Sequence, residues 1–310
     1  MCCLFGLIDY RHTLTAKQKT RLVSALATAA EARGTDATGI AYNSDGKLHI
    51  YKRPLPAHCM HFQLPQDAAV VMGHTRMTTQ GSARRNRNNH PFLGHTDSGD
   101  FAFAHNGVLY NDVMLRRTLS LPRTRIETDS YIGVQLIEQK KTLNFDSLRY
   151  MAEQVEGSFS FTALDKRNGL WIVKGDSPLC IYHFPRLGVY VYASTEEILQ
   201  KALFQVRFPE KQFNKLDLDC GELLRIDHKG KLSRSQFDDF NLCCWYEPMW
   251  RTPVSKASHY AAILEEEDTY LDEIKSVAAA FGYTPESIDR LANLGFSPEE
   301  LEELLYCGEL

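Results

Sequence analysis

The 310-residue sequence predicts an α+β fold in which two β-sheets pack together and helices cover their outer faces. Three observations support this prediction. Apolar runs of strand length recur in residues 1–105 and again in 157–226. Amphipathic helical segments lie between these two regions. The order is therefore strands, helices and strands again, which favours two packed sheets over the strand–helix alternation that builds a parallel sheet.

The amino-terminal half begins with a short apolar run at 3–8, which predicts a strand. Residues 15–32 are rich in Ala, Leu, Lys and Glu at helical spacing, and Gly34 follows where a helix stop is expected. The polar residues 43–47 predict a hairpin turn between two strands. The other predicted strands of this half are 38–42, 48–52, 68–72 and 100–105, and its other helices are 111–119, 128–140, with Thr128 as N-cap, and 145–154.

Two connecting segments of this half have distinctive compositions. The strand at 68–72 ends at Gly73, and a polar segment rich in Asn, Arg, Thr and Gly follows at 75–99. A segment of this length is unusual for an idle connection, and such loops often carry function. The strand at 100–105 is expected to stop at Asn106-Gly107, because Asn-Gly readily forms a turn.

The second half is rich in predicted strands. Its strands are expected at 159–164, 170–173, 179–183, 189–193 and 222–226. Residues 194–203 predict a helix with Ser or Thr at its cap, and 227–230 predict the turn of a last hairpin.

The composition changes near 243–255, where two Trp and two Pro occur, and the chain beyond 259 has only helical patterns. We therefore predict a main domain at 2–241 and a linker with a helical tail at 242–310. Pro285 and Pro298 each follow Thr or Ser, as at helix starts. The tail loosely resembles a three-helix ubiquitin-associated bundle, and a helical clamp on the main domain is the favoured alternative.

Net charge, hydropathy and cysteine pattern limit the kinds of function that this protein can have. A net charge of −4 argues against a nucleic-acid-binding surface. The basic segment 84–87 is interpreted as a solvated loop, the alternative being a contact with an anionic substrate or partner. No apolar run reaches the length of a membrane span, so we expect no membrane association. The eight cysteines lack the pattern of a disulfide framework, which favours a reducing cytoplasm.

No metal site is predicted. Cys59 and His61 form the one compact Cys/His pair, and a zinc site normally needs four ligands at characteristic spacing. Histidines also occur at 74, 90, 95 and 105, without Cys or carboxylate partners at ligand spacing. We interpret them as hydrogen-bonded structural residues, and no cofactor is expected.

Cys2 directly follows the initiator methionine, in the context where that methionine is normally removed. Removal leaves a residue that carries a thiol and a free α-amine together. The α-amine titrates near neutral pH and can act as the base that the thiol needs. Nucleophile and base would then belong to one residue.

Six segments in order resemble the class II, or N-terminal-nucleophile, glutamine amidotransferases, and are similar to the glutaminase domain of glucosamine-6-phosphate synthase. The segments are CCLFG at 2–6, RGTDATG at 33–39, GHTRMTTQG at 73–81, NHPF at 89–92, HNG at 105–107 and ETDS at 127–130. The resemblance extends from Cys2 to about Ile226. It implies a four-layer αββα N-terminal-nucleophile hydrolase sandwich with a small helical C-terminal appendage.

The resemblance also implies catalytic roles. Cys2 would attack the side-chain amide of glutamine, with its own α-amine as base. The side-chain amide of Asn106 and the backbone N–H of Gly107 would bind the oxyanion of the tetrahedral intermediate.

Substrate-binding roles follow in the same way. Arg76 would pair with the α-carboxylate of glutamine, since a planar guanidinium can bind a carboxylate through two donors. Asp129 would accept from the α-ammonium, and Thr79 matches a substrate-contact threonine. Arg33 and Asp36 are expected to shape the turn behind the nucleophile strand.

Three positions depart from the family pattern. Cys3 replaces the usual Gly, Met77 stands where an aromatic residue is common, and Gln80 stands where the most similar relatives have His. Met77 and Gln80 fall in the loop that closes over glutamine in the family. The departures therefore bear on substrate preference and coupling, and not on the core mechanism.

The resulting hypothesis is hydrolysis of L-glutamine to glutamate and ammonia through a γ-glutamyl thioester on Cys2. About 70 residues follow Asn241 and contain no pattern of a synthase, so the ammonia acceptor is expected on a separate chain. Residues 245–250 and the tail are candidate docking surfaces. The alternatives are a stand-alone hydrolase of other γ-glutamyl amides and a catalytically silent subunit that binds a partner.

Overall fold

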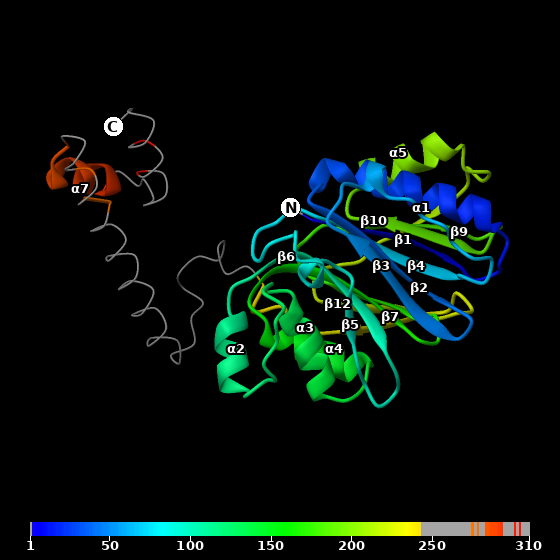
Figure 1. Cartoon of the computed structure of the whole chain (residues 1–310), viewed down its shortest axis with the longest axis horizontal. Helices are drawn as coiled ribbons and strands as arrows, with labels where there is room; N and C mark the ends of the chain where they lie inside the picture. The colour runs from blue at the N-terminus through cyan, green and yellow to red at the C-terminus, as the bar shows by residue number, and fades with distance from the viewer. Residues whose placement is uncertain are drawn as a thin grey trace. The chain divides into compact units, whose positions relative to one another are not determined.

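Two antiparallel sheets stacked face to face lie at the centre of the fold (Figure 1). The computed structural model describes residues 2–242, 274, 275, 278, 283–293, 301 and 304. The first sheet has the strand order β11-β9-β10-β1-β4-β2-β3, and the second has the order β13-β12-β8-β7-β6-β5. Paired neighbours run antiparallel in both sheets.

The strands of the first sheet are β1 (Cys3–Asp9), β2 (Ala37–Ser44), β3 (Lys47–Arg53), β4 (Val70–Arg76), β9 (Cys180–Phe184), β10 (Val189–Ala193) and β11 (Asn214–Leu216). The strands of the second sheet are β5 (Phe92–Gly94), β6 (Phe101–Leu109), β7 (Gly157–Asp165), β8 (Leu170–Lys174), β12 (Glu222–Ile226) and β13 (Leu232–Gln236).

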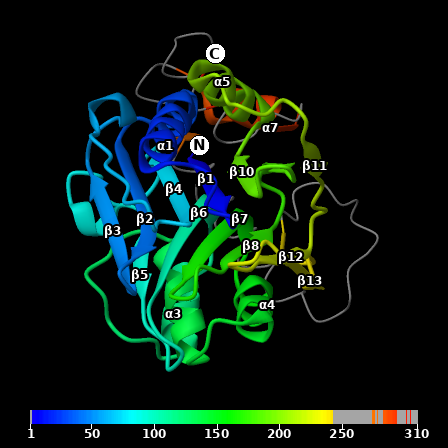
Figure 2. The same ribbon diagram turned by 90° about the vertical axis from the view of Figure 1, so that its right-hand side faces the viewer.

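Helices cover the outer face of each sheet, so the fold has four layers. Helices α1 (Ala16–Ala30) and α5 (Glu196–Val206) pack on the first sheet, and α3 (Tyr131–Gln139) and α4 (Phe145–Gln154) pack on the second. Figure 2 shows the same layers after a 90° turn. The short helix α2 (Asp112–Thr118) contacts α3. The predicted αββα sandwich is confirmed.

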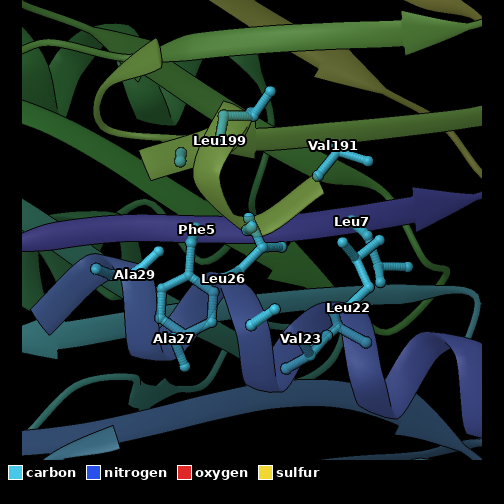
Figure 3. Close-up of a cluster of buried hydrophobic side chains, with 14 of the residues drawn as sticks. Phe5, Leu7, Leu22, Val23, Leu26, Ala27, Ala29, Val191 and Leu199 are labelled. Atoms are coloured by element: carbon cyan, nitrogen blue, oxygen red, sulfur yellow. The ribbon is translucent and has the colours of Figure 1, made fainter. Parts of the chain in front are cut away.

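Residue alternation along β1 explains why this strand is buried on both faces. Phe5 and Leu7 pack against the α1 and α5 layer, together with Leu22 and Leu26 (Figure 3). Leu4 and Ile8 point the opposite way, because side chains alternate along a strand. They join the apolar cluster between the sheets.

Polar side chains cap the N-termini of three helices, as the preference for Ser, Thr, Asp and Asn at the N-cap position predicts. Thr15 accepts from the backbone N–H of Gln18 at the start of α1, and Asn144 accepts from Ser147 at the start of α4. Thr195 accepts from Ile198 and caps α5.

Three local predictions were wrong. Strand β4 continues to Arg76, and β6 continues through Asn106 and Gly107 to Leu109. Both extensions are hydrogen-bonded into ladders with neighbouring strands, which overrides the local turn preference. Ser130 is the N-cap residue of α3, and the predicted cap Thr128 lies outside it.

Several shorter elements complete the connections. Single 3₁₀ turns occur at Glu31–Arg33, Ala57–Cys59 and Asn86–Asn88. The short strands β5 and β11 were not predicted from the sequence. None of the helices among the described residues has the length and apolar character needed to span a membrane.

The chain divides into two compact units, Met1–Trp245 and Tyr246–Leu310. In the second unit, α7 spans Pro285–Asn293 and begins at a proline, as predicted. Ile274, Ala278, Ile288 and Leu301 form a small buried cluster there. Pro298 and residues 245–250 lie outside the described residues. The predicted boundary after residue 241 stays a prediction.

Candidate functional site

Cys2, Arg76 and Asn106 meet at one end of the space between the sheets. Arg76 shares its face of β4 with Val70 and Met72, and Asn106 shares its face of β6 with Ala102 and Ala104. Those four apolar residues belong to the cluster between the sheets. Cys3 and Thr75 are partners in the β1–β4 ladder, which brings Cys2 beside Arg76.

Cys2 is half-buried and lies directly before strand β1. Its Sγ is 3.5 Å from the carbonyl oxygen of Met77, and its own carbonyl accepts from Nε of Arg33 at 2.8 Å. Burial raises the pKa of the Cys2 thiol; the charge of Arg76 lowers this pKa and the charge of Asp129 raises it. The thiol therefore lies within the electrostatic influence of both predicted substrate-binding charges.

Arg76 is 3% exposed, and the surrounding chain holds its guanidinium in place. Nη1 donates to Oδ1 of Asn89 at 2.7 Å, and Nη2 donates to the carbonyls of Gln80 and Gly81 at 2.5 and 2.9 Å. These bonds hold the guanidinium through both of its terminal nitrogens. The pKa of Arg76 is lowered by burial, while Cys2, Asp129 and Asp36 raise it.

Asn106 and Gly107 lie within the β6–β7 ladder, opposite Ser160 and Phe159. Asn106 is 1% exposed, and its Nδ2 is 3.5 Å from Oγ of Ser194. Gly107 has φ +143°, and a Cβ placed there would lie 1.9 Å from the Ser158 carbonyl oxygen. Only glycine fits this backbone without displacing β7.

Asp129 is buried just before α3, where backbone and side-chain donors fix its carboxylate. Oδ2 accepts from the backbone N–H of Leu109 at 2.7 Å, and Oδ1 accepts from Oγ of Ser130 at 3.2 Å. The backbone of Leu109 therefore joins Asp129 to the same strand that carries Asn106.

Three histidines are buried beside these residues. The rings of His74 and His90 are tilted by 33° with centroids 4.1 Å apart, and a ring nitrogen of His74 lies 2.9 Å from the His105 carbonyl oxygen. Burial lowers the pKa of each, that of His74 to about 3. Burial therefore favours the neutral form of the imidazole at each of the three positions. Among the described residues, no group of His, Cys, Asp and Glu is arranged to hold a metal ion.

The RGTD segment at 33–36 lies against the backbone of Arg76 and Thr78, close to the nucleophile Cys2. A Cβ at Gly34 would lie 2.4 Å from the Arg76 carbonyl carbon, so the two backbones can approach only without a side chain. The Asp36 N–H donates to the Arg76 carbonyl at 2.9 Å, and its Oδ2 accepts from Thr78 N–H at 2.7 Å. A pocket of about 440 Å³ opens here, lined by residues 31–36 with Met77 and Thr78.

The structure does not bring every predicted residue into this cluster. Thr79 is exposed in the segment that follows Arg76. Two residues without a predicted role do contact the cluster, Asn89 through Arg76 and Ser194 through Asn106. Asn89 lies in the NHPF segment, which marked it as notable, whereas Ser194 was predicted only as part of a helix start.

Comparison with known proteins gives consistent relationships. Residues 74–201 match a family described as "Glutamine amidotransferase domain". The chain is 32% identical over 161 residues to glutamine–fructose-6-phosphate aminotransferase [isomerizing] of Bacillus licheniformis, covering 49% of this chain and 26% of that protein. It is 28% identical over 260 residues to amidophosphoribosyltransferase of Methanocaldococcus jannaschii, covering 78% and 52%. The chain thus spans between a quarter and about half of these relatives.

The fold is also shared with a solved structure. Glutamine phosphoribosylpyrophosphate amidotransferase from B. subtilis superposes with a TM-score of 0.60 at 21% identity. The match covers 78% of this chain and 51% of that one. At this level of identity, the likeness concerns the fold.

Proposed function

The chain carries a glutamine amidotransferase domain of the class II, N-terminal-nucleophile family, and we propose that it hydrolyses L-glutamine to L-glutamate and ammonia. The observation that carries this proposal is the convergence of Cys2, Arg76 and Asn106 at one end of the space between the sheets. These side chains supply a nucleophile, a cation for a carboxylate and an amide donor.

The first half-reaction forms a thioester. Removal of Met1 frees the α-amine of Cys2, which takes the thiol proton as Sγ attacks the side-chain carbonyl of glutamine. The C–O double bond opens to an oxyanion, which Asn106 Nδ2 and the Gly107 N–H stabilise. The oxyanion then collapses, the C–N bond breaks, and the nitrogen leaves as ammonia after receiving the proton from the α-ammonium.

The second half-reaction regenerates the thiol. Water attacks the γ-glutamyl thioester and gives its proton to the α-amine. The C–S bond breaks, glutamate leaves, and the sulfur recovers a proton. The same oxyanion donors act in both half-reactions, since each passes through a tetrahedral intermediate.

Recognition of the amino-acid end of glutamine is assigned to Arg76 and Asp129. Arg76 would pair with the α-carboxylate, and Asp129 would accept from the α-ammonium. Both charges act on the pKa of the Cys2 thiol, and this supports the proposal that the two side chains bind one small substrate beside it. Thr79 is proposed to contact substrate from the loop after Arg76, and its exposed position requires that loop to fold inward.

The ammonia is proposed to serve an acceptor enzyme on a separate chain. The relatives named above include aminotransferases and phosphoribosyltransferases longer than this chain. The chain is proposed to act in the cytoplasm.

The test is ammonia release by the purified full chain. L-glutamine should give equal amounts of glutamate and ammonia, and Cys2→Ala should abolish turnover while Cys59→Ala, which changes an exposed cysteine, should not. Parallel assays with other γ-glutamyl amides identify the leaving group that is preferred. Full turnover by Cys2→Ala would exclude the mechanism. Retention of Met1 would indicate a silent subunit.

A further inference from the structure

Ser194 is fixed against the nucleophile strand by hydrogen bonds to Leu4. It follows β10 directly and is fully buried. Its Oγ accepts from the Leu4 N–H at 2.9 Å, and its own N–H donates to the Leu4 carbonyl at 2.9 Å. Leu4 is two residues beyond Cys2, so the position of the Ser194 hydroxyl is set by the strand that carries the nucleophile.

The same hydroxyl reaches the opposite sheet. Ser194 Oγ lies 3.5 Å from the carboxamide of Asn106, on β6. Asn106 Oδ1, by contrast, is buried and has no hydrogen-bond partner in the orientation with Nδ2 toward Ser194. An unpartnered buried acceptor is destabilising, because it has lost its hydrogen bonds to water. This orientation also directs an N–H donor at serine instead of substrate.

The Asn106 carboxamide has a second arrangement, in which Oδ1 and not Nδ2 faces Ser194. Ser194 Oγ accepts from the Leu4 N–H, and its own proton can be donated either to the Leu4 carbonyl, at 3.5 Å, or to an acceptor on Asn106. A half-turn of the Asn106 carboxamide places Oδ1 on that proton, and the two ends of an amide are related by this rotation. The buried acceptor then has a donor, and both N–H groups of Asn106 become available to an oxyanion.

We infer that Ser194 is a positioning residue that holds Asn106 Oδ1 and thereby turns the Asn106 amide donors toward the carbon attacked by Cys2. This inference rests on the proposed function, because Asn106 has an oxyanion to stabilise only if Cys2 attacks a carbonyl. The chain of contacts runs from the Leu4 N–H through the Ser194 hydroxyl to Asn106. It couples the nucleophile strand of one sheet to the oxyanion donor of the other.

The first test separates kcat from KM. Ser194→Ala is expected to lower kcat for glutamine hydrolysis by about 10- to 100-fold, since a misdirected donor loses most of the effect of an oxyanion-hole group. KM should stay within about threefold, because Ser194 does not touch the amino-acid end of substrate. Ser160→Ala is the matched control: Ser160 is equally buried and faces Asn106 in the ladder, but its hydroxyl donates to the Ser177 carbonyl.

The second test is a double-mutant cycle with Asn106→Ala. If Ser194 acts through Asn106, adding Ser194→Ala to that variant should change kcat by less than about twofold. An equal loss in both backgrounds would overturn the inference, as would a Ser194→Ala protein with kcat within about twofold of wild type. If Ser194→Ala fails to fold, Ser194→Cys keeps the volume with a weaker donor and is expected to give an intermediate loss.

A spectroscopic test is independent of turnover. In protein labelled with ¹⁵N at asparagine, Ser194→Ala should shift the Asn106 side-chain NH₂ resonances, and Ser160→Ala should leave them in place. Unshifted resonances in Ser194→Ala would contradict the contact itself. The two variants could show the expected shifts while the wild-type protein never hydrolyses glutamine. That result would refute the proposed function and would still support the hydrogen bonds from Leu4 through Ser194 to Asn106.

Discussion

Arg76 donates from Nη1 to Oδ1 of Asn89 across 2.7 Å, and both side chains are buried. Asn89 is itself fixed, because its Nδ2 donates to the Ala83 carbonyl at 2.7 Å. Its backbone carbonyl accepts from the ammonium of Lys52. Asn89 therefore holds the guanidinium in one orientation before any substrate arrives.

Replacing Asn89 should weaken glutamine binding more than it slows chemistry. Asn89→Ala removes a charge-assisted hydrogen bond, and we expect KM for glutamine to rise about tenfold, with a smaller change in kcat. Steady-state kinetics checks this. Asn43→Ala is the control, because Asn43 is a buried asparagine whose amide binds the Asp165 carbonyl elsewhere in the fold. An unchanged KM in Asn89→Ala would show that Arg76 is positioned without it.

A methyl group at Gly107 should be incompatible with the site. Gly107→Ala would place Cβ 1.9 Å from the Ser158 carbonyl oxygen at φ +143°, so β6 and β7 would have to separate. We expect loss of glutaminase activity and a lower melting temperature. Gly46→Ala also has positive φ, at +71°, but no atom lies within 4 Å of its Cβ. That control should cost only about 1–2 kcal/mol, and comparable damage in both variants would refute the steric argument.

The buried histidines should make the protein sensitive to acid. In the unfolded chain a histidine takes up a proton near pH 6.5, whereas burial lowers the pKa of His74 to about 3. Between these values the unfolded state binds more protons. Stability is therefore fully present above about pH 6.5 and falls as the pH decreases through this window.

Urea unfolding at a series of pH values checks this expectation. His74→Gln removes one titrating group and keeps a donor for the His105 carbonyl. The slope of unfolding free energy against pH should become shallower by up to about 1.4 kcal/mol per pH unit in this variant. Identical slopes in the two proteins would mean that His74 is protonated in the folded state.

The ion pair between Asp9 and Lys19 should be important for stability, because neither side chain is exposed and their charged atoms lie 3.3 Å apart. Lys19→Met leaves Asp9 buried without its cation, and we expect a loss of about 3–5 kcal/mol in chemical denaturation. The exposed pair Lys215–Glu196, at 2.9 Å, is the control, and Lys215→Met should cost less than about 1 kcal/mol. A small loss in Lys19→Met would show that Asp9 is solvated or neutral.

Strong periodicity made much of the fold predictable. Helix α4 and strands β10 and β12 have the predicted bounds, since each has a clear apolar pattern ended by turn residues. The end of β6 was missed for a physical reason. Asn106-Gly107 favours a turn locally, but its ladder with β7 decides the conformation, and those partners lie more than 50 residues away.

The candidate site was predictable only where short motifs mark it. Cys2, Arg76, Asn106 and Asp129 each lie in such a motif, although their roles stay proposals. Ser194 could not be predicted, because its partner Leu4 is 190 residues distant in sequence. A hydroxyl at a helix start is ordinarily a cap, and only the packing of β10 beside β1 reveals the second contact.

The most direct measurement treats the full-length protein with a diazoketone analogue of glutamine and then sequences its amino-terminal peptide by mass spectrometry. We predict that Met1 is absent, that one label is attached to the sulfur of Cys2, and that excess L-glutamine prevents labelling. A retained Met1, or a label on any other cysteine with Cys2 unmodified, would contradict the assignment of Cys2 as the nucleophile.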